Sequence, residues 1–382
     1  MVKKAKKDKN KKSSVKEIDN KKNESKEIVV KTPVVFPYKE IKVIKSPLQK
    51  SLNYCFLSSS KKYIIACDHS LLLFLNPKDF NVLSKHLYST SIISLMELSD
   101  NKLLILDFYQ FYIYEITDKY ELKIFFHYKN DHLALGCDEG SDGTIFIIYS
   151  DCVKYFKREK ENEIKLNFEL NLGNFVNLSY GDYNATQFKG GFVNQDKIFI
   201  LDYQEMYIFD IIEKNLINSL IVSDREILLK YIKLSNNFTL IYHKQMLVLF
   251  DNKNVEIVNQ FYINNEEEEE ITCCETIEKK SLIIYGTNMG KIYIYDYKGM
   301  NVIKEICLNT KKFGVYLIKE LDNNLIVCNY PQSKVAFVDY ISGNIQAELN
   351  LKNSSYYRKG IYLENEGKIL LGCAKNFAII SK

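Results

Sequence analysis

The sequence predicts an all-β fold, in which eight four-stranded sheets form a closed ring, a β-propeller. Three observations support this prediction. A short apolar run that ends in a polar residue recurs at a nearly constant spacing, further strand-like runs precede and follow each copy, and the runs nearest the two ends of the chain complement one another. β-Branched and aromatic residues dominate these runs, and the apolar spacing typical of helices is scarce.

One stretch near the middle of the second half shows the repeated unit most clearly. It has two strand-like runs, residues 282–285 and 291–295, and Gly286, Asn288 and Gly290 mark a turn between them. Two such runs joined by a short Gly- and Asn-containing segment are typical of a β-hairpin. The same design recurs along most of the chain.

The second run of this hairpin has eight copies. The copies are Leu72–Asn76, Phe111–Glu115, Val153–Lys157, Met206–Asp210, Leu247–Asp251, Ile292–Asp296, Val335–Asp339 and Phe377–Ser381. Their last residues are 39, 42, 53, 41, 45, 43 and 42 positions apart. Each copy lies within a set of four strand-like runs, and four strands in about 40–45 residues are typical of a propeller blade.

The two ends of the chain predict how the ring closes. The last repeat ends at Ser381-Lys382, directly after its third strand, and residues 40–45 form a strand-like run that belongs to no complete repeat. We expect residues 40–45 to supply the missing outer strand, which would leave no open end in the ring. Seven blades are the alternative, if residues 131–172 do not form a regular blade. We expect residues 32–382 to form one propeller domain, preceded by a tail of residues 1–31.

The repeats resemble, in degenerate form, those of the WD40 family. Gly286 to Asp296 is similar to that family's small-residue turn, third strand and closing Trp-Asp pair, with Tyr295-Asp296 in place of Trp-Asp. The resemblance extends over about residues 34–382. It implies a propeller that serves as a platform for protein partners and is seldom an enzyme.

The predicted tail carries most of the positive charge of the chain. Residues 1–31 hold twelve Lys and five acidic residues, a net charge of about +7, against +4 for the whole chain. Such a composition predicts a disordered segment. It could be a nuclear localisation signal, an arm for RNA or another anionic surface, or a solvated tail without a partner. The candidate contact residues are Lys3, Lys4, Lys6, Lys7, Lys11 and Lys12.

Two further segments are candidate sites for partner binding. An insertion at residues 179–191 accounts for the longest repeat spacing and carries aromatic residues between glycines, which suits a binding loop. A run of five acidic residues could contact a basic partner or remain a solvated loop. The candidate residues of these segments are Tyr180, Tyr183, Phe188, Glu266, Glu267, Glu268, Glu269 and Glu270.

The residues that commonly support catalysis or metal binding show no recognisable pattern. The nine Cys include no CxxC pair and are expected to be free thiols in a reducing compartment. His127 and His132 lie close together in sequence without a second ligand pair at zinc spacing. No nucleophile motif, phosphate-binding loop or dinucleotide fingerprint occurs, so we expect no catalytic residue, metal or cofactor.

The sequence therefore predicts an intracellular protein, in the cytoplasm or nucleus, with neither a secretory signal nor an apolar run long enough to span a membrane. The first hypothesis is a non-catalytic scaffold that assembles protein partners on its faces. The alternative is an RNA- or ribonucleoprotein-associated propeller whose Lys-rich tail contacts phosphates. A propeller enzyme with a polar axial site is the third hypothesis.

Overall fold

The computed structural model describes residues 36–48, 50, 52–160, 163–172, 189–201, 205–222, 230–234, 237–263, 269–308, 314–322, 324–330, 334–351, 357, 359–373 and 376–382. By its internal contacts the chain divides into Met1–Val35 and Phe36–Lys382, and the second unit contains every described residue.

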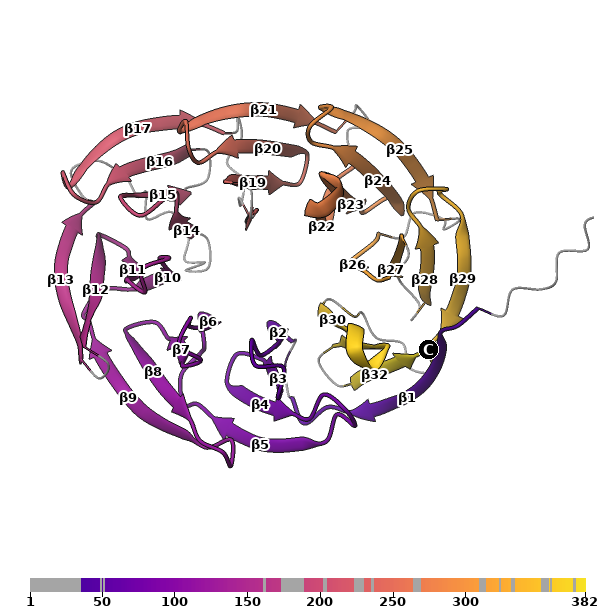
Figure 1. Cartoon of the computed structure of the whole chain (residues 1–382), viewed down its shortest axis with the longest axis horizontal. Helices are drawn as coiled ribbons and strands as arrows, with labels where there is room; N and C mark the ends of the chain where they lie inside the picture. Colours follow the sequence, from indigo (N-terminus) through magenta and orange to yellow (C-terminus); the bar gives the residue numbers. More distant parts are fainter. Residues whose placement is uncertain are drawn as a thin grey trace, which may run out of the picture. The chain divides into compact units, whose positions relative to one another are not determined.

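The second unit is a ring of eight four-stranded antiparallel sheets (Figure 1). The first four blades are blade 1, β2 (Tyr54–Leu57), β3 (Ile64–Cys67), β4 (Leu71–Leu75) and β5 (Val82–Leu87); blade 2, β6 (Ser94–Glu97), β7 (Leu103–Leu106), β8 (Gln110–Ile116) and β9 (Leu122–Lys129); blade 3, β10 (Ala134–Glu139), β11 (Ile145–Tyr149), β12 (Cys152–Lys160) and β13 (Glu163–Asn171); and blade 4, β14 (Lys189–Phe192), β15 (Lys197–Leu201), β16 (Glu205–Asp210) and β17 (Asn215–Ile221).

The other four blades complete the ring. They are blade 5, β18 (Lys230–Lys233), β19 (Phe238–His243), β20 (Met246–Asp251) and β21 (Glu256–Tyr262); blade 6, β22 (Ile271–Ile277), β23 (Leu282–Thr287), β24 (Lys291–Asp296) and β25 (Asn301–Cys307); blade 7, β26 (Leu317–Glu320), β27 (Leu325–Tyr330), β28 (Lys334–Asp339) and β29 (Ile345–Asn350); and blade 8, β30 (Lys359–Leu363), β31 (Lys368–Gly372), β32 (Asn376–Ser381) and β1 (Lys39–Lys45).

Eight blades confirm the predicted architecture. The eight repeated runs are the third strands β4, β8, β12, β16, β20, β24, β28 and β32. Residues 131–172 contain the regular blade 3, so the seven-blade alternative is wrong. One detail of the best repeat also differs from expectation. Gly286 was predicted as a turn residue but lies within β23, where a Cβ atom would come 2.7 Å from the Cβ of Val315.

The predicted closure of the ring is confirmed by the pairing of β1 with β32. Val43 lies opposite Ala378 and Lys45 opposite Asn376, in antiparallel register. The segment that leads into β1 also contacts the previous blade, because Tyr38 is buried and its ring stacks on Phe337 of β28 at 5.1 Å. The beginning of the described chain is thus held by blade 8 and by blade 7.

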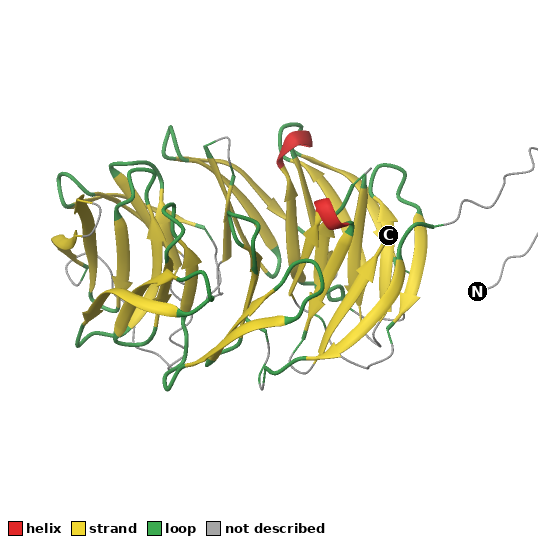
Figure 2. Cartoon of the chain, turned by 60° about the horizontal axis from the view of Figure 1, so that its bottom comes forward, coloured by secondary structure: helices red, strands yellow, loops and turns green. Residues whose placement is uncertain are grey.

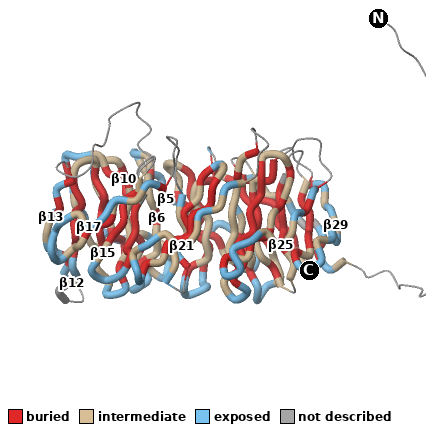
Figure 3. The backbone as a smooth tube through the Cα atoms, turned by 90° about the horizontal axis from the view of Figure 1, so that it is seen from above, coloured by how far each residue is buried: buried red, intermediate tan, exposed pale blue. Residues whose placement is uncertain are grey.

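Buried apolar residues lie between the blades, as eight separate clusters. Each cluster joins two neighbouring blades; one of them, for example, combines Leu104 and Phe111 of blade 2 with Ile147 and Phe156 of blade 3. The second and third strands are almost wholly buried because both of their faces meet a neighbouring blade, whereas the outer strands alternate between covered and exposed residues (Figure 3). Every blade therefore depends on two others for its core.

The same irregularity marks the outer strand of every blade. The register between the third strand and the outer strand shifts by one residue near the end of the third strand in all eight sheets, including the β1–β32 pair. Such bulges increase the local twist of a sheet.

The aspartate that ends many of the repeated runs has a structural role. In blade 6 the Asp296 carboxylate accepts hydrogen bonds from the backbone N–H groups of Lys298 and Gly299, which fixes the turn into the outer strand. The corresponding aspartates of three other blades, Asp210, Asp251 and Asp339, accept the same pair of bonds. The repeated Asp is therefore explained by turn formation.

Strands make up nearly all of the regular structure (Figure 2). Within the described ranges the helices are two single turns of 3-10 type, η1 (Glu278–Lys280) and η2 (Glu364–Glu366), and neither could cross a bilayer.

Candidate interaction surface

The up-and-down order of the strands gives the ring two different faces. We call the face at which the innermost strands begin the connection face; it bears the links from each outer strand to the next blade, such as residues 88–93 and 130–133, and the turns between second and third strands. The opposite face bears the turns between first and second strands and those between third and outer strands. The links between blades vary most in length, so the connection face is the more variable surface.

Both predicted binding segments belong to links on the connection face. One link joins β13 to β14 and contains residues 179–188 of the predicted insertion, whose last three residues, 189–191, belong to strand β14 instead. The other link joins β21 to β22 and contains the acidic run. Most of the candidate side chains lie outside the described residues. These are Lys3, Lys4, Lys6, Lys7, Lys11, Lys12, Tyr180, Tyr183, Phe188, Glu266, Glu267 and Glu268.

Glu269, in the acidic run, is a buried residue with internal partners. Its side chain is 1 % exposed, and its carboxylate accepts a hydrogen bond of 2.8 Å from the Thr287 hydroxyl. Lys291 Nζ lies 3.5 Å from the same carboxylate, and the Tyr293 hydroxyl lies 3.3 Å from it. Burial would lower the pKa of Lys291, but the bond to Tyr293 and the charge of Glu269 raise it above its usual value. Glu269 therefore anchors the end of the acidic run to blade 6.

Glu270 is more accessible and joins two blades. Its carboxylate forms an ion pair with Lys244, whose Nζ lies 2.9 Å from Oε1 of Glu270. Lys244 lies in the turn between β19 and β20 of blade 5. Its backbone N–H donates to the Asn288 side chain at 2.8 Å, and its carbonyl accepts from the Asn288 N–H at 2.9 Å. The sequence prediction treated all five acidic residues alike and missed this difference. The strand pattern that begins at Ile271 was the available signal that the last two would be held in place.

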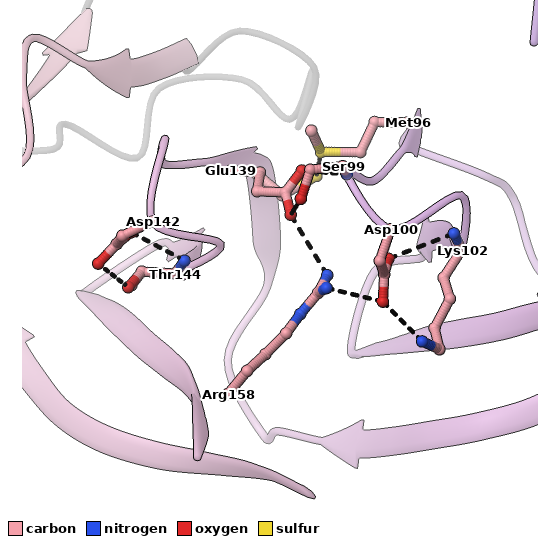
Figure 4. A network of polar contacts seen from close by, with 9 residues as sticks. Met96, Ser99, Asp100, Lys102, Glu139, Asp142, Thr144 and Arg158 are labelled. Carbon is pink, nitrogen blue, oxygen red and sulfur yellow. Dashed lines mark hydrogen bonds and ion pairs between the residues drawn. The ribbon is translucent and has the colours of Figure 1, made fainter. Parts of the chain in front are cut away.

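An ionic network on the opposite face connects blades 2 and 3 (Figure 4). Arg158 Nη1 lies 2.7 Å from the Asp100 carboxylate, and Arg158 Nη2 lies 3.3 Å from that of Glu139. The Glu139 carboxylate also accepts hydrogen bonds from the backbone and the hydroxyl of Ser99. Because each of these groups is bound by another member of the network, it serves as a bridge between blades.

The cations of this network favour the ionised form of the Asp100 carboxylate. Burial would raise the pKa of Asp100, but the hydrogen bond from Lys102 and the charge of Arg158 hold it below its usual value. The cost of partial burial is thus outweighed by the two cations beside it.

Two ion pairs join innermost strands near the axis of the ring. Lys319 of β26 lies 2.5 Å from Glu275 of β22, and Lys233 of β18 is paired with Asp138 of β10. The second pair spans blade 4, where a Cβ on Gly191 would come 2.9 Å from Lys233 Cε. Because Gly191 has no side chain, the Lys233 side chain of blade 5 can cross blade 4 and reach Asp138 of blade 3.

The cysteines are free, as the sequence predicts, and their environments vary from buried to exposed. Burial raises the pKa of the Cys55, Cys137 and Cys273 thiols to about 12. These thiols are therefore protonated at neutral pH and unsuited to nucleophilic attack.

The two neighbouring histidines have separate partners. His127 stacks on Tyr112 with ring centroids 4.4 Å apart, and His132 Nδ1 lies 3.0 Å from the Asp151 carboxylate. In the described part of the chain, no three His, Cys, Asp or Glu side chains are grouped so that they could hold a metal ion.

Comparison with known proteins adds a likeness of fold. The sequence matches no family model and no curated protein. Among solved structures, the chain is similar to Sqt1 of Saccharomyces cerevisiae, with a TM-score of 0.67 and 12 % sequence identity over 91 % of this chain and 99 % of that one. It is also similar to the C-terminal WD40 domain of Sif2, with a TM-score of 0.65, 12 % identity and the same coverage of both chains. At this level of identity the likeness concerns the fold alone.

Proposed function

We propose that this chain, a WD40-repeat-like β-propeller, is a non-catalytic scaffold that binds other proteins through its connection face. The observation that carries the proposal is that the two candidate binding segments, residues 179–191 and 266–270, fall at the passages from β13 to β14 and from β21 to β22, which both lie on that face. Aromatic and acidic side chains on two links of the same face would offer a partner both apolar contact and charge.

The residues that follow the acidic link are held by contacts with blades 5 and 6. Glu269 is held by Thr287 and Lys291, and Glu270 is held by Lys244 of the adjacent blade. A binding surface mounted on paired strands loses less conformational freedom when a partner docks. The acidic link therefore leaves the ring from a fixed point.

The chemistry near the axis supports a role without catalysis. Two acidic side chains of the described innermost strands are bound to other blades: Asp138 to Phe192 N–H and Lys233, and Glu275 to Lys319. Carboxylates held in this way stabilise the ring and are not poised as a general acid or base.

Affinity capture with full-length variants tests the proposed surface. One variant replaces Tyr180, Tyr183 and Phe188 by Ser, and a second replaces Glu266, Glu267 and Glu268 by Gln. The matched control replaces two exposed residues in the third-to-outer turns of the opposite face, Ile212→Ser and Ile341→Ser, which are 66 % and 51 % exposed.

We expect at least one partner that the wild-type chain captures reproducibly to be absent with a connection-face variant and retained by the control, as measured by quantitative mass spectrometry. Capture of the same partners by all four proteins would contradict the choice of face. Failure of the wild-type chain to capture any reproducible partner from its own cell type would contradict the scaffold role.

A second function, contact with RNA, is favoured by the concentration of positive charge in residues 1–31. Removing one lysine–phosphate interaction should reduce the slope of log affinity against log salt by about 0.7 for single-stranded RNA. Changing Lys3, Lys4, Lys6, Lys7, Lys11 and Lys12 to Gln in the full chain should therefore flatten the slope. An unchanged slope would rule out this use of the tail.

A further inference from the structure

The outer strand of every blade has one open edge. The strand order places β5, β9, β13, β17, β21, β25, β29 and β1 at the outer ends of their sheets, on the rim of the ring (Figure 1). An open edge is a template for pairing with another chain, and proteins protect such edges with β-bulges and with charged side chains. All eight outer strands have the bulge, so their charged residues distinguish one edge from another.

Strand β17 of blade 4 lacks this second protection. It reads Asn-Leu-Ile-Asn-Ser-Leu-Ile and is the only one of the eight described outer strands without a charged residue. Each of the other seven carries at least one charged residue that is exposed. Examples, one from each strand, are Lys42 in β1, Lys85 in β5, Lys123 in β9, Lys165 in β13, Glu256 in β21, Glu305 in β25 and Glu348 in β29.

The exposed side chains of β17 are also unusually apolar for an edge. Ile217, at the bulge, is 44 % exposed, and Ile221, at the end of the strand, is 70 % exposed. Asn218 and Ser219 are exposed between them. The rim of blade 4 therefore presents isoleucine and small or neutral polar groups where the other blades present charge.

The backbone of β17 is regular over its second half. Residues Asn218 to Ile221 lie opposite Ile208 to Glu205 of β16 without a register shift, so the strand could continue the ladder on its other side. The nearest preceding charged residues, Glu213 and Lys214, belong to the turn before the strand. Lys214 Nζ lies 4.9 Å from the ring centre of Phe168, so this lysine reaches toward blade 3.

We infer that two copies of this chain associate through β17, by antiparallel pairing of the two strands across a two-fold axis. An uncharged edge is matched by another uncharged edge, because no charged side chain then loses its water without gaining a partner. A second copy of the chain supplies such an edge. In the pair no like charges lie opposite one another, and Ile217 and Ile221 are covered by the exposed side chains of the other copy.

The scarcity of such edges limits the assembly to two copies. A two-fold interface uses the same surface of both molecules, so pairing occupies β17 in each of them. The other outer strands, which carry exposed charge, are protected against further pairing. The contact lies on the rim, so it does not depend on the connection face being the site for other proteins.

Sedimentation velocity of the full-length chain over a series of concentrations tests the pairing. The test variant, Ile217→Lys with Ile221→Lys, gives β17 the protection that it lacks. The control, Leu166→Lys with Ile303→Lys, adds the same charge at residues of β13 and β25 that are 41 % and 48 % exposed. We expect a dimer whose dissociation constant rises about tenfold or more in the test variant and stays unchanged in the control.

Three results of this experiment would overturn the inference. They are a wild-type chain that remains a monomer, equal dimerisation of all three proteins, and growth beyond the dimer. The salt dependence gives a further criterion, since pairing without charges should not weaken as KCl is raised. A dimer that dissociates with added salt would indicate an ionic contact and contradict pairing through β17.

Amide hydrogen exchange of the wild-type chain tests strand pairing without any variant. Pairing protects the outward N–H groups of β17, so exchange over residues 215–221 should slow as the protein concentration rises, while exchange over β25 stays the same. Dimerisation that leaves the exchange of β17 unchanged would place the contact elsewhere and overturn the inference. A monomeric wild-type chain that captures another protein, which Ile217→Lys with Ile221→Lys abolishes, would assign this edge to a different partner and would also overturn it.

Discussion

Replacing Arg158 by Met should uncouple blades 2 and 3 on the face opposite the connection face. The Arg158 side chain is 20 % exposed and bridges Asp100 at 2.7 Å and Glu139, which is 9 % exposed, at 3.3 Å. Charge-assisted hydrogen bonds contribute about 1.5–3 kcal/mol when sheltered, and exposed pairs contribute less than about 1 kcal/mol. The side chains of this network are partly sheltered from solvent, so their contribution should lie between these two values. We expect Arg158→Met to lower the free energy of unfolding by about 2 kcal/mol.

Urea unfolding followed by far-UV circular dichroism measures this change. Lys85→Met is the charge-matched control and should shift the unfolding free energy by less than about 0.5 kcal/mol. Asp100→Asn made alone and together with Arg158→Met gives a double-mutant cycle, in which we expect a coupling of about 0.5–1 kcal/mol. An Arg158→Met effect no larger than that of Lys85→Met would refute the role of the network.

Three further predictions concern stability. Tyr38→Ala should lower the free energy of unfolding by about 3 kcal/mol in thermal or urea unfolding, because it removes a buried ring that stacks on Phe337, whereas Tyr109→Ala, at a residue 51 % exposed, should have little effect. Gly143→Ala should cost about 1 kcal/mol in the same assay, since its φ of 78° is left-handed and no atom lies near the added methyl group; an equally stable variant would contradict this reason. Stability should fall as the pH drops below about 4, because the pKa of Asp100 is held under its ordinary value of 3.8, and Asp100→Asn should reduce this acid sensitivity in urea titrations at pH 3–6.

The sequence was sufficient to predict the repeated part of the fold. The third strands have a local signature, a mainly apolar run of four residues with a polar end, and the spacing of these copies predicts the blade size without knowledge of any contact. The closure by residues 40–45 was also predictable, because the last repeat is one strand short. Both predictions depend only on the residues within each segment and on the order of the segments along the chain.

Interactions between distant residues were not predictable in this way. Lys233 and Asp138 are 95 positions apart, and no spacing rule brings them together across blade 4. The burial of Glu269 was missed because its neighbours in sequence are four other glutamates, while its partners Thr287 and Lys291 come from two other strands.

The most direct test of the central claim, a ring closed by its own two ends, is amide hydrogen exchange of β32 in the full-length chain. The comparison is with Val43→Pro, which places a residue that cannot donate a hydrogen bond opposite Ala378. The account predicts slow exchange over residues 376–381 in the wild-type chain and faster exchange there in the variant, with β20 of blade 5 unchanged. Equally slow exchange of β32 in both proteins would contradict it.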